Sequence, residues 1–338
     1  MPAPDNDQDI AQSSRRTLLR FAAAVPMSTL VLGSAFAQDF PAKPIRLVVP
    51  FPPGGPTDGI ARLAGEGLAA KLGQPVTVIN KAGAAGGIAS EFVAREPADG
   101  YTLLVAGQGQ MFINKALGRK MGYDPDTDFQ FLGMLGAFPN VLVVNPDVIS
   151  AKSLKEFLEL ARQKPGALSY GSNGIGSLAH LTTEVLAEAA KVKFLHVPYQ
   201  GAAPMMADLL SGRIGFSVTG ASGVLGFIKE GKLRPLAVST GKRFADLPDV
   251  PTFVESGFPS LEAPVWFGAY AASATPAPVL AKLRAALGDV LGTSQYESSL
   301  SKLAAQPMPI PAETAQARFQ GEKKMWVDAV ERTGAKGN

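Results

Sequence analysis

Short apolar runs alternate with longer amphipathic segments along most of the chain. The runs are rich in Val, Ile and Leu, as buried strands are, and the longer segments repeat their apolar residues with the period of a helix. Because helices separate consecutive strands, the pattern predicts an α/β fold with parallel sheets that carry helices on both faces. The expected strands are Ile45–Val49, Val76–Ile79, Thr102–Ala106, Val141–Val144, Leu168–Tyr170, Phe194–Val197, Ile214–Val218, Leu236–Ser239 and Trp266–Ala271.

Two of the expected helices have clear ends in the sequence. Apolar residues at fourfold spacing from Ile60 to Leu72 predict a helix that ends at Gly73. Ser153-Leu154-Lys155-Glu156 is a capping-box sequence, and Pro165-Gly166 stops the helix that it begins. Helix boundaries at these places therefore have a chemical reason.

A strand that runs into a glycine-rich loop and then into a helix occurs twice, about 125 residues apart. The first loop is Phe51–Asp58 and the second is Gly171–Ser177. A chain of 338 residues is more than twice a common domain length of roughly 150, which favours two lobes. We expect each lobe to carry one loop at the carboxyl end of a strand, where open α/β sheets bind ligands.

Both loops have the chemistry of an anion site. Glycine lets a ligand approach the backbone amides, and we expect Gly54 and Gly171 to adopt backbone angles that a β-carbon would oppose. The helix that follows each loop adds unpaired N–H groups and the positive end of its dipole. Neither loop contains Lys or Arg, so amides and hydroxyls would hold a carboxylate. Asp58 is better suited to capping its own helix than to touching an anion. The alternative for each loop is a tight turn that binds nothing.

Other candidate residues have ordinary alternatives. A further loop at Gly83–Gly87 is also consistent with a plain helix entry, and Tyr199, at a strand tip, is also consistent with a surface tyrosine. His180 and Glu184 share a helix face, but a capping or packed histidine is more common than a metal ligand, and His196 has the surroundings of a core residue. Neither main loop fits a phosphate or dinucleotide motif, the serine-hydrolase motif is absent around Ser172, and no cofactor is expected.

The composition excludes several other classes of function. The chain has no cysteine, which excludes disulfides, thiolate metal sites and thiol nucleophiles. With 32 Lys and Arg against 29 Asp and Glu, the net charge is +3, too weak and dispersed for nucleic-acid binding. Hydrophobic residues make up 46% of the chain and charged residues 18%, which is typical of a soluble globular protein.

The N-terminal residues 1–37 have the pattern of a cleavable export signal. Arg15-Arg16 precede the apolar stretch Phe21–Leu32 and a small-residue cleavage site at Ala35-Phe36-Ala37. The stretch is too short to span a bilayer. The arginine pair suits either a twin-arginine signal or a general secretory signal. Because no cysteine follows the site, we expect the mature chain to be free in the periplasm.

A series of characteristic short segments runs in order along nearly the whole mature sequence. They are Pro41–Asp58, Pro97–Leu104, Tyr123-Asp124-Pro125, Ser153-Leu154-Lys155, Leu168–Ser172, His196–Tyr199, Leu247–Thr252, Glu255-Ser256-Gly257 and Trp266-Phe267-Gly268. In these segments the chain resembles the Bug-type solute-binding proteins of tripartite tricarboxylate transporters.

The resemblance implies a two-lobed type II periplasmic binding fold with the ligand cleft between its lobes. Lobe 1 would combine residues 39–139 and 259–338, and lobe 2 would span residues 140–258. It implies a monomer that passes a small organic carboxylate to membrane permease subunits, without catalysis. The implied ligand site consists of Phe51, Pro53, Gly54, Gly55, Thr57, Asp58, Gly171, Ser172, Asn173, Gly174 and Ser177, with Gly86, Gly87, His180, Tyr199 and Gly201 as further carry-overs.

Some positions depart from the family pattern. Gln200 replaces a basic residue, Ser217–Gly220 follows Phe216 where an acidic residue is common, and Gln108–Met111 is richer in amides than usual. We expect these segments to set ligand identity, and the missing acidic residue favours a dicarboxylate or aromatic acid over an amino acid. Two rival functions stay open, a periplasmic carboxylate-processing enzyme and a ligand-sensing subunit for a membrane kinase.

Overall fold

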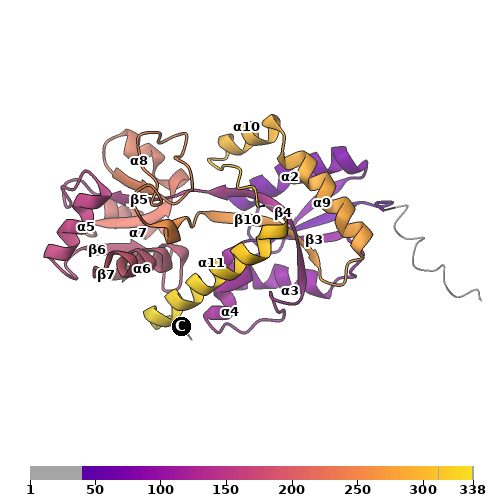
Figure 1. The fold of residues 1–338 in the computed structure, drawn as a ribbon, viewed down its shortest axis with the longest axis horizontal. Coiled ribbons are helices and arrows are strands. Elements are labelled where there is room, and N and C mark those ends of the chain that lie inside the picture. The colour runs from indigo at the N-terminus through magenta and orange to yellow at the C-terminus, as the bar shows by residue number, and fades with distance from the viewer. Residues whose placement is uncertain (1–39, 311, 337–338) are drawn as a thin grey trace, which may run out of the picture. The chain divides into compact units, whose positions relative to one another are not determined.

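The computed structural model describes residues 40–310 and 312–336, so the predicted export signal lies outside the described residues. Two five-stranded sheets organise the unit formed by residues 41–338 (Figure 1). The first has the order β2–β1–β3–β10–β4, with strands Val76–Asn80, Ile45–Val49, Thr102–Ala106, Val265–Ala272 and Phe129–Phe138. The second has the order β7–β6–β8–β5–β9, with strands Leu195–Pro198, Ser169–Ser172, Phe216–Gly220, Asn140–Val144 and Arg234–Val238.

The predicted α/β fold is confirmed, but the expectation of parallel sheets holds only in part. β1 is parallel to β2 and β3, and β6 is parallel to β7 and β8. However, β10 is antiparallel to β3 and β4, and β5 is antiparallel to β8 and β9. The exceptions lie where the chain changes sheets: β4 ends at Phe138 and β5 begins at Asn140, and the chain returns to the first sheet in β10. Each sheet is therefore mixed.

All nine strands predicted from the sequence are present, with ends shifted by up to two residues, but β4 was not predicted. Two glycines interrupt its apolar pattern, and the structure gives both a packing reason. A β-carbon on Gly133 would lie 2.9 Å from Leu287 Cδ2, and one on Gly136 would lie 2.8 Å from Ile60 Cδ1. Glycine there lets two helices, α9 (Ala277–Leu291) and α2 (Pro56–Leu72), approach the strand closely.

Both helix ends examined in the sequence are confirmed. α2 ends at Gly73, whose φ of 68° is left-handed and whose N–H donates to the Ala69 carbonyl. α5 (Leu154–Gln163) begins at Ser153, whose side chain accepts from the Glu156 N–H at 3.2 Å. The Glu156 carboxylate accepts from the N–H of Lys152, at 2.8 Å, instead of closing the box on Ser153.

The remaining helices cover the sheets and connect them. α11 (Ala312–Thr333) packs on η2 (Gly109–Ile113) beside the first sheet and on α6 (Leu178–Ala190) beside the second (Figure 1). Within the described residues, no helix is both long and apolar enough to cross a membrane. The other helical elements are η1 (Ala84–Gly86), α3 (Gly87–Arg95), α4 (Asn114–Ala116), α7 (Ala202–Leu210), η3 (Ala221–Gly223), α8 (Leu225–Lys229), η4 (Pro259–Leu261) and α10 (Ser294–Lys302).

Candidate functional site

The first glycine loop is braced by Asp58. Its carboxylate accepts from the Gly54 N–H at 3.0 Å, from Asn80 Nδ2 at 2.9 Å and from Arg62 Nε at 2.9 Å. The hydrogen bond from Arg62 is the main cause that lowers the pKa of Asp58 to about 2, against the opposing effect of burial. Asp58 therefore stabilises its own loop through the Gly54 N–H, and its oxygens are fully engaged, but it does not cap α2 as the sequence suggested.

The start of α2 keeps its amides free. Gly55 is the N-cap, no side chain caps the helix, and Pro56 occupies the first turn without donating. Within the part of the chain that the structure describes, no acceptor takes the N–H groups of Gly55, Thr57 or Asp58. Unpaired amides with the helix dipole behind them form the kind of arrangement that binds anions.

Two further residues of the first loop have fixed surroundings. The ring of Phe51 packs edge-on against Phe267 of β10 at 6.1 Å between centroids, and its carbonyl accepts from Asn80 Nδ2 at 3.0 Å. Pro53 and Gly54 are exposed. Gly54 has a left-handed φ of 84°, which glycine adopts without strain.

Gly171 in the second loop needs glycine for a different reason from the one expected. The sequence suggested a backbone angle that a β-carbon would oppose, but Gly171 lies inside β6 and is not left-handed. A β-carbon there would lie 2.4 Å from Ile214 Cδ1 and 2.6 Å from Met205 Cγ. The left-handed glycines of this loop are Gly174, with φ of 121°, and Gly176, with φ of 73°.

Internal hydrogen bonds hold the second loop. The N–H of Gly174 donates to Ser172 Oγ at 3.2 Å, and the N–H of Gly176 donates to His180 Nδ1 at 3.1 Å. Ser177 caps α6 by accepting from the His180 N–H at 3.4 Å. The amides of Asn173 and Ile175, both exposed residues, have no acceptor within the described residues. The amides of Gly174 and Gly176 are therefore bonded within the loop, and the intervening ones lack an acceptor among the described residues.

A stack of rings lies under this loop. His180 stacks on His196 at 3.9 Å between centroids with 8° between the planes, and His196 stacks on Tyr170 at 4.8 Å. The Tyr170 hydroxyl donates to Glu184 Oε1 at 2.6 Å. Burial lowers the pKa of both histidines to about 4, so both are neutral at pH 7. Sequence reasoning did not connect the two histidines, since β7 places His196 beside Tyr170 only through strand pairing.

Ser172 and His196 have the spacing of a nucleophile and its base but lack the required access. Ser172 Oγ lies 2.7 Å from His196 Nε2. However, Ser172 has no exposed surface, and its hydroxyl also contacts the carbonyl and the N–H of Gly174. Attack on a substrate would require displacement of these bonds. Ser172 is therefore a brace for the loop.

The other predicted loops have structural roles of their own. Tyr199 donates its hydroxyl to Asp208 at 2.8 Å, and mainly through burial its pKa is raised to about 12. Gly201, with φ of 105°, is the N-cap of α7. Gly86 has φ of 88°, and a β-carbon there would lie 2.2 Å from Gln110 Nε2. Gly87 begins α3.

Gln108 and Gln110, in the segment expected to set ligand identity, use their side-chain amides in hydrogen bonds inside the protein. Gln108 and Gln110 are 1% and 2% exposed. Gln108 bonds the Pro264 carbonyl and the Trp266 N–H, and Gln110 bonds the Ala85 carbonyl at 2.8 Å and the Gly107 N–H at 3.0 Å. They hold β10 and the Gly83–Gly87 loop in place, so their side chains do not offer free groups to a ligand.

No hydrogen bond, ion pair or ring contact among the described residues joins the first loop to the second. A link from the Gly83–Gly87 loop to the second glycine loop runs through α4 and Leu117, the residue that follows it. Asn114 Nδ2 donates to the Ala85 carbonyl at 3.3 Å, and a β-carbon on Gly176 would lie 3.0 Å from Leu117 Cδ2. The Gly83–Gly87 loop and the second glycine loop therefore lie against neighbouring residues of one short segment.

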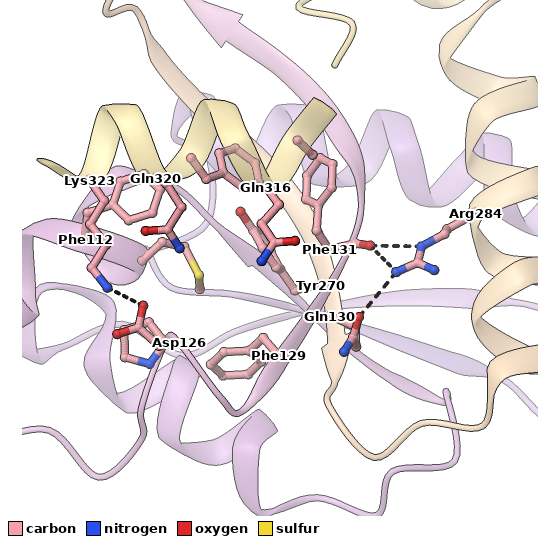
Figure 2. A pocket seen from close by; sticks show the side chains of 14 residues that line it. Phe112, Asp126, Phe129, Gln130, Phe131, Tyr270, Arg284, Gln316, Gln320 and Lys323 are labelled. Carbon is pink, nitrogen blue, oxygen red and sulfur yellow. Dashed lines mark hydrogen bonds and ion pairs between the residues drawn. The ribbon is translucent and has the colours of Figure 1, made fainter. Parts of the chain in front are cut away.

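A cavity of about 370 Å³ lies under α11 (Figure 2). Its charged groups are bonded to the protein: Asp126 pairs with Lys115 and Lys323, and Arg284 donates to the Phe131 carbonyl at 2.9 Å. Met111, the last residue of the Gln108–Met111 segment, lines it, but none of the residues of the implied ligand site does. The described residues contain no group of three or more His, Asp or Glu that could hold a metal ion.

Comparisons with known proteins give one family. The pattern that describes the tripartite tricarboxylate transporter family receptor, TctC, matches residues 60–335. Protein BugT of Bordetella pertussis is 33% identical over 301 residues, which are 89% of this chain and 92% of BugT. Two solved structures from Rhodopseudomonas palustris are also similar. Rpa4515 with adipate is 34% identical with a TM-score of 0.71, covering 88% of this chain and 99% of that one. MatC with bound malate is 32% identical with a TM-score of 0.66, covering 86% and 100%.

Proposed function

The chain belongs to the family of tripartite tricarboxylate transporter receptors and has their two-lobed α/β binding-protein fold, and we propose that it captures a small carboxylate in the periplasm. The captured anion is passed, unchanged, to membrane permease subunits of a tripartite transporter. The protein works as a monomer in this proposal. Lobe 1 comprises residues 39–139 and 259–338, and lobe 2 comprises residues 140–258.

One observation carries the choice of ligand: the uncapped start of α2. The N–H groups of Gly55, Thr57 and Asp58 are available there, and the carboxylate of Asp58 is neutralised by Arg62. A helix N-terminus of this kind favours a negative group over a neutral one. The second loop contributes the amides of Asn173 and Ile175 from the other sheet.

A dicarboxylate or an aromatic acid suits the site better than an amino acid. An α-ammonium group needs an anionic acceptor when it is buried. After Phe216 the chain offers Ser217, which has no exposed surface and donates to the Gly171 carbonyl at 2.9 Å. The relatives with adipate and malate are consistent with this class of ligand.

The test is a thermal-shift screen of the purified protein, followed by calorimetry. Adipate, malate, succinate and benzoate form one set, and aspartate, glutamate and glucose form the other. A ligand at 100 times its Kd stabilises by about 2.7 kcal/mol, enough to raise Tm by several degrees. We expect a shift with a member of the first set. A shift with glucose alone would contradict the carboxylate assignment, and tight binding of aspartate with none of adipate or benzoate would contradict the class.

A further inference from the structure

We propose that His180 is a positioning residue for the ligand loop Gly171–Ser177, and that it holds the loop in binding shape only while its imidazole is neutral. This inference rests on the proposed function, because the loop's role in binding is part of that function.

The first step is the proton on His180. Nδ1 of His180 accepts the N–H of Gly176 at 3.1 Å, so Nδ1 carries no proton and a neutral ring must carry its proton on Nε2. A second proton would have to go to Nδ1. It would turn this acceptor into a donor facing another donor, and the bond to Gly176 would be lost.

The second step is what this bond does for the loop. Gly176 is buried and left-handed, and it lies between Ile175, whose amide has no acceptor in the described residues, and Ser177, which caps α6. Release of Gly176 frees the loop at its junction with the helix. The amides of Asn173 and Ile175 then lose the fixed geometry that an anion needs.

The third step is the surroundings, which favour the neutral ring. His180 is 4% exposed and lies flat against His196. If both rings were protonated, two positive charges would lie on rings whose centroids are 3.9 Å apart. Burial holds the pKa of His180 near 4. The facing groups on neighbouring elements are Tyr170 on β6 and His196 on β7. α6 itself adds Glu184, bonded to Tyr170, and Glu188, which pairs with Arg332 of α11 at 2.6 Å. β8 and η4 contribute no titratable side chain.

The direction of the pH effect follows from these pKa values. In the locked loop His180 has a pKa of about 4, and in an unlocked loop it returns toward its ordinary value of 6.5. Because the unlocked loop binds more protons between these values, acidification from pH 6.5 toward 4 favours the unlocked form. Carboxylate affinity should fall in the same window.

Two substitutions separate the role of His180 as a hydrogen-bond acceptor from the role of its ring in stacking. His180→Asn places Oδ1 where Nδ1 stood, so the bond from Gly176 survives and cannot titrate. His180→Phe keeps the ring that stacks on His196 but has no acceptor. With adipate as the probe, we expect His180→Asn to bind within about threefold of the wild type at pH 7.5, and His180→Phe to bind about three- to tenfold more weakly.

The pH profile is the decisive measurement. Adipate itself titrates near pH 5, but it does so equally for every variant, so the comparison removes this effect. At pH 4.5 we expect His180→Asn to bind adipate about tenfold more tightly than the wild type. The reason is that protonation of His180 removes the hydrogen bond from Gly176 in the wild type only. Parallel profiles for the two proteins, or full affinity of a folded His180→Phe at pH 7.5, would overturn the proposal.

Amide hydrogen exchange at Gly176 provides a readout that needs no ligand. Between pH 7.5 and 4.5 the wild type should lose protection at Gly176 relative to His180→Asn measured at the same pH. If adipate binds none of the proteins at any pH, the proposed function fails for this carboxylate, and the exchange result alone decides the role of His180. Equal protection in both proteins at every pH would refute it.

Discussion

Two buried tyrosines differ in a single hydrogen bond. Tyr296 donates its hydroxyl to the Leu135 carbonyl at 2.9 Å, whereas the hydroxyl of Tyr270 has no partner among the described residues. Both side chains are 4% exposed. Tyr270 packs against Phe131, with 5.5 Å between ring centroids, and both line the cavity under α11 (Figure 2). An unpaired buried hydroxyl lowers stability, so the two residues should respond oppositely to removal of their oxygen.

Tyr270→Phe should therefore raise the free energy of unfolding by about 1 kcal/mol, since it removes an unsatisfied polar group and keeps the ring. Tyr296→Phe is the matched control and should lower it by about 0.5–1.5 kcal/mol. Chemical denaturation followed by circular dichroism measures both. A loss of stability in Tyr270→Phe as large as that in the control would mean that its hydroxyl is paired in solution.

Gly54 and Gly171 require glycine for different reasons, a left-handed backbone at Gly54 and close packing at Gly171. A β-carbon on Gly54 would meet no atom within 4 Å, but a valine there must adopt a φ of 84°, which costs about 1–2 kcal/mol. We expect Gly54→Val to fold and to weaken carboxylate binding more than Thr57→Val, because the loop amides shift. Unchanged adipate affinity by calorimetry would contradict the role of this loop.

Gly171→Val tests packing and not backbone shape. The new side chain would press on Met205 and Ile214, and overpacking of this kind costs about 1–3 kcal/mol. Its effect should appear first as lower stability in denaturation experiments. The sequence identified both glycines as special, but only the backbone of the folded chain distinguishes a left-handed turn from a crowded strand.

At the scale of elements, the end of α6 carries a strained residue. Lys191 follows the helix with a left-handed φ of 54°, a conformation that glycine usually occupies at this position. Lys191→Gly should raise the free energy of unfolding by about 0.5–1 kcal/mol. The control is Lys193→Gly, also exposed but not left-handed, which should lower stability because it only adds freedom to the unfolded chain. Equal losses in the two variants would contradict this account.

The elements also show how far sequence reasoning reaches. Patterns that depend on neighbours in the chain gave correct results, such as the cap at Ser153 and the helix end at Gly73. β4 was not predicted because its glycines are required by close packing against α2 and α9, which are distant in the sequence. The stack of His180 on His196 depends on strand pairing in the same way. The proposal of an anion site at the first loop could be made from the sequence because its amides and its helix are consecutive residues.

At the scale of the whole molecule, α11 joins the two sheets. Its Trp326 is fully buried and donates to Glu322, which also accepts from Trp266 of β10. One cluster of buried apolar side chains includes Leu104 of the first sheet, Trp326 and Phe216 of the second sheet. Burial raises the pKa of Glu322, because it disfavours the charged carboxylate. The hydrogen bonds from the two indole N–H groups act in the opposite direction and stabilise the charge. The two sheets therefore share part of their core through one helix.

This shared core predicts cooperative unfolding. A chain of this length with two sheets could unfold in two steps, but a core that spans both sheets couples them. We expect one transition, with coincident denaturation curves from tryptophan fluorescence, which reports on Trp266 and Trp326, and from far-ultraviolet circular dichroism, which reports on both sheets. Trp326→Ala should lower the stability by about 3–5 kcal/mol and move both curves together. If only the fluorescence curve moved, or if calorimetry resolved two peaks, the sheets would be energetically independent and α11 would belong to the first alone.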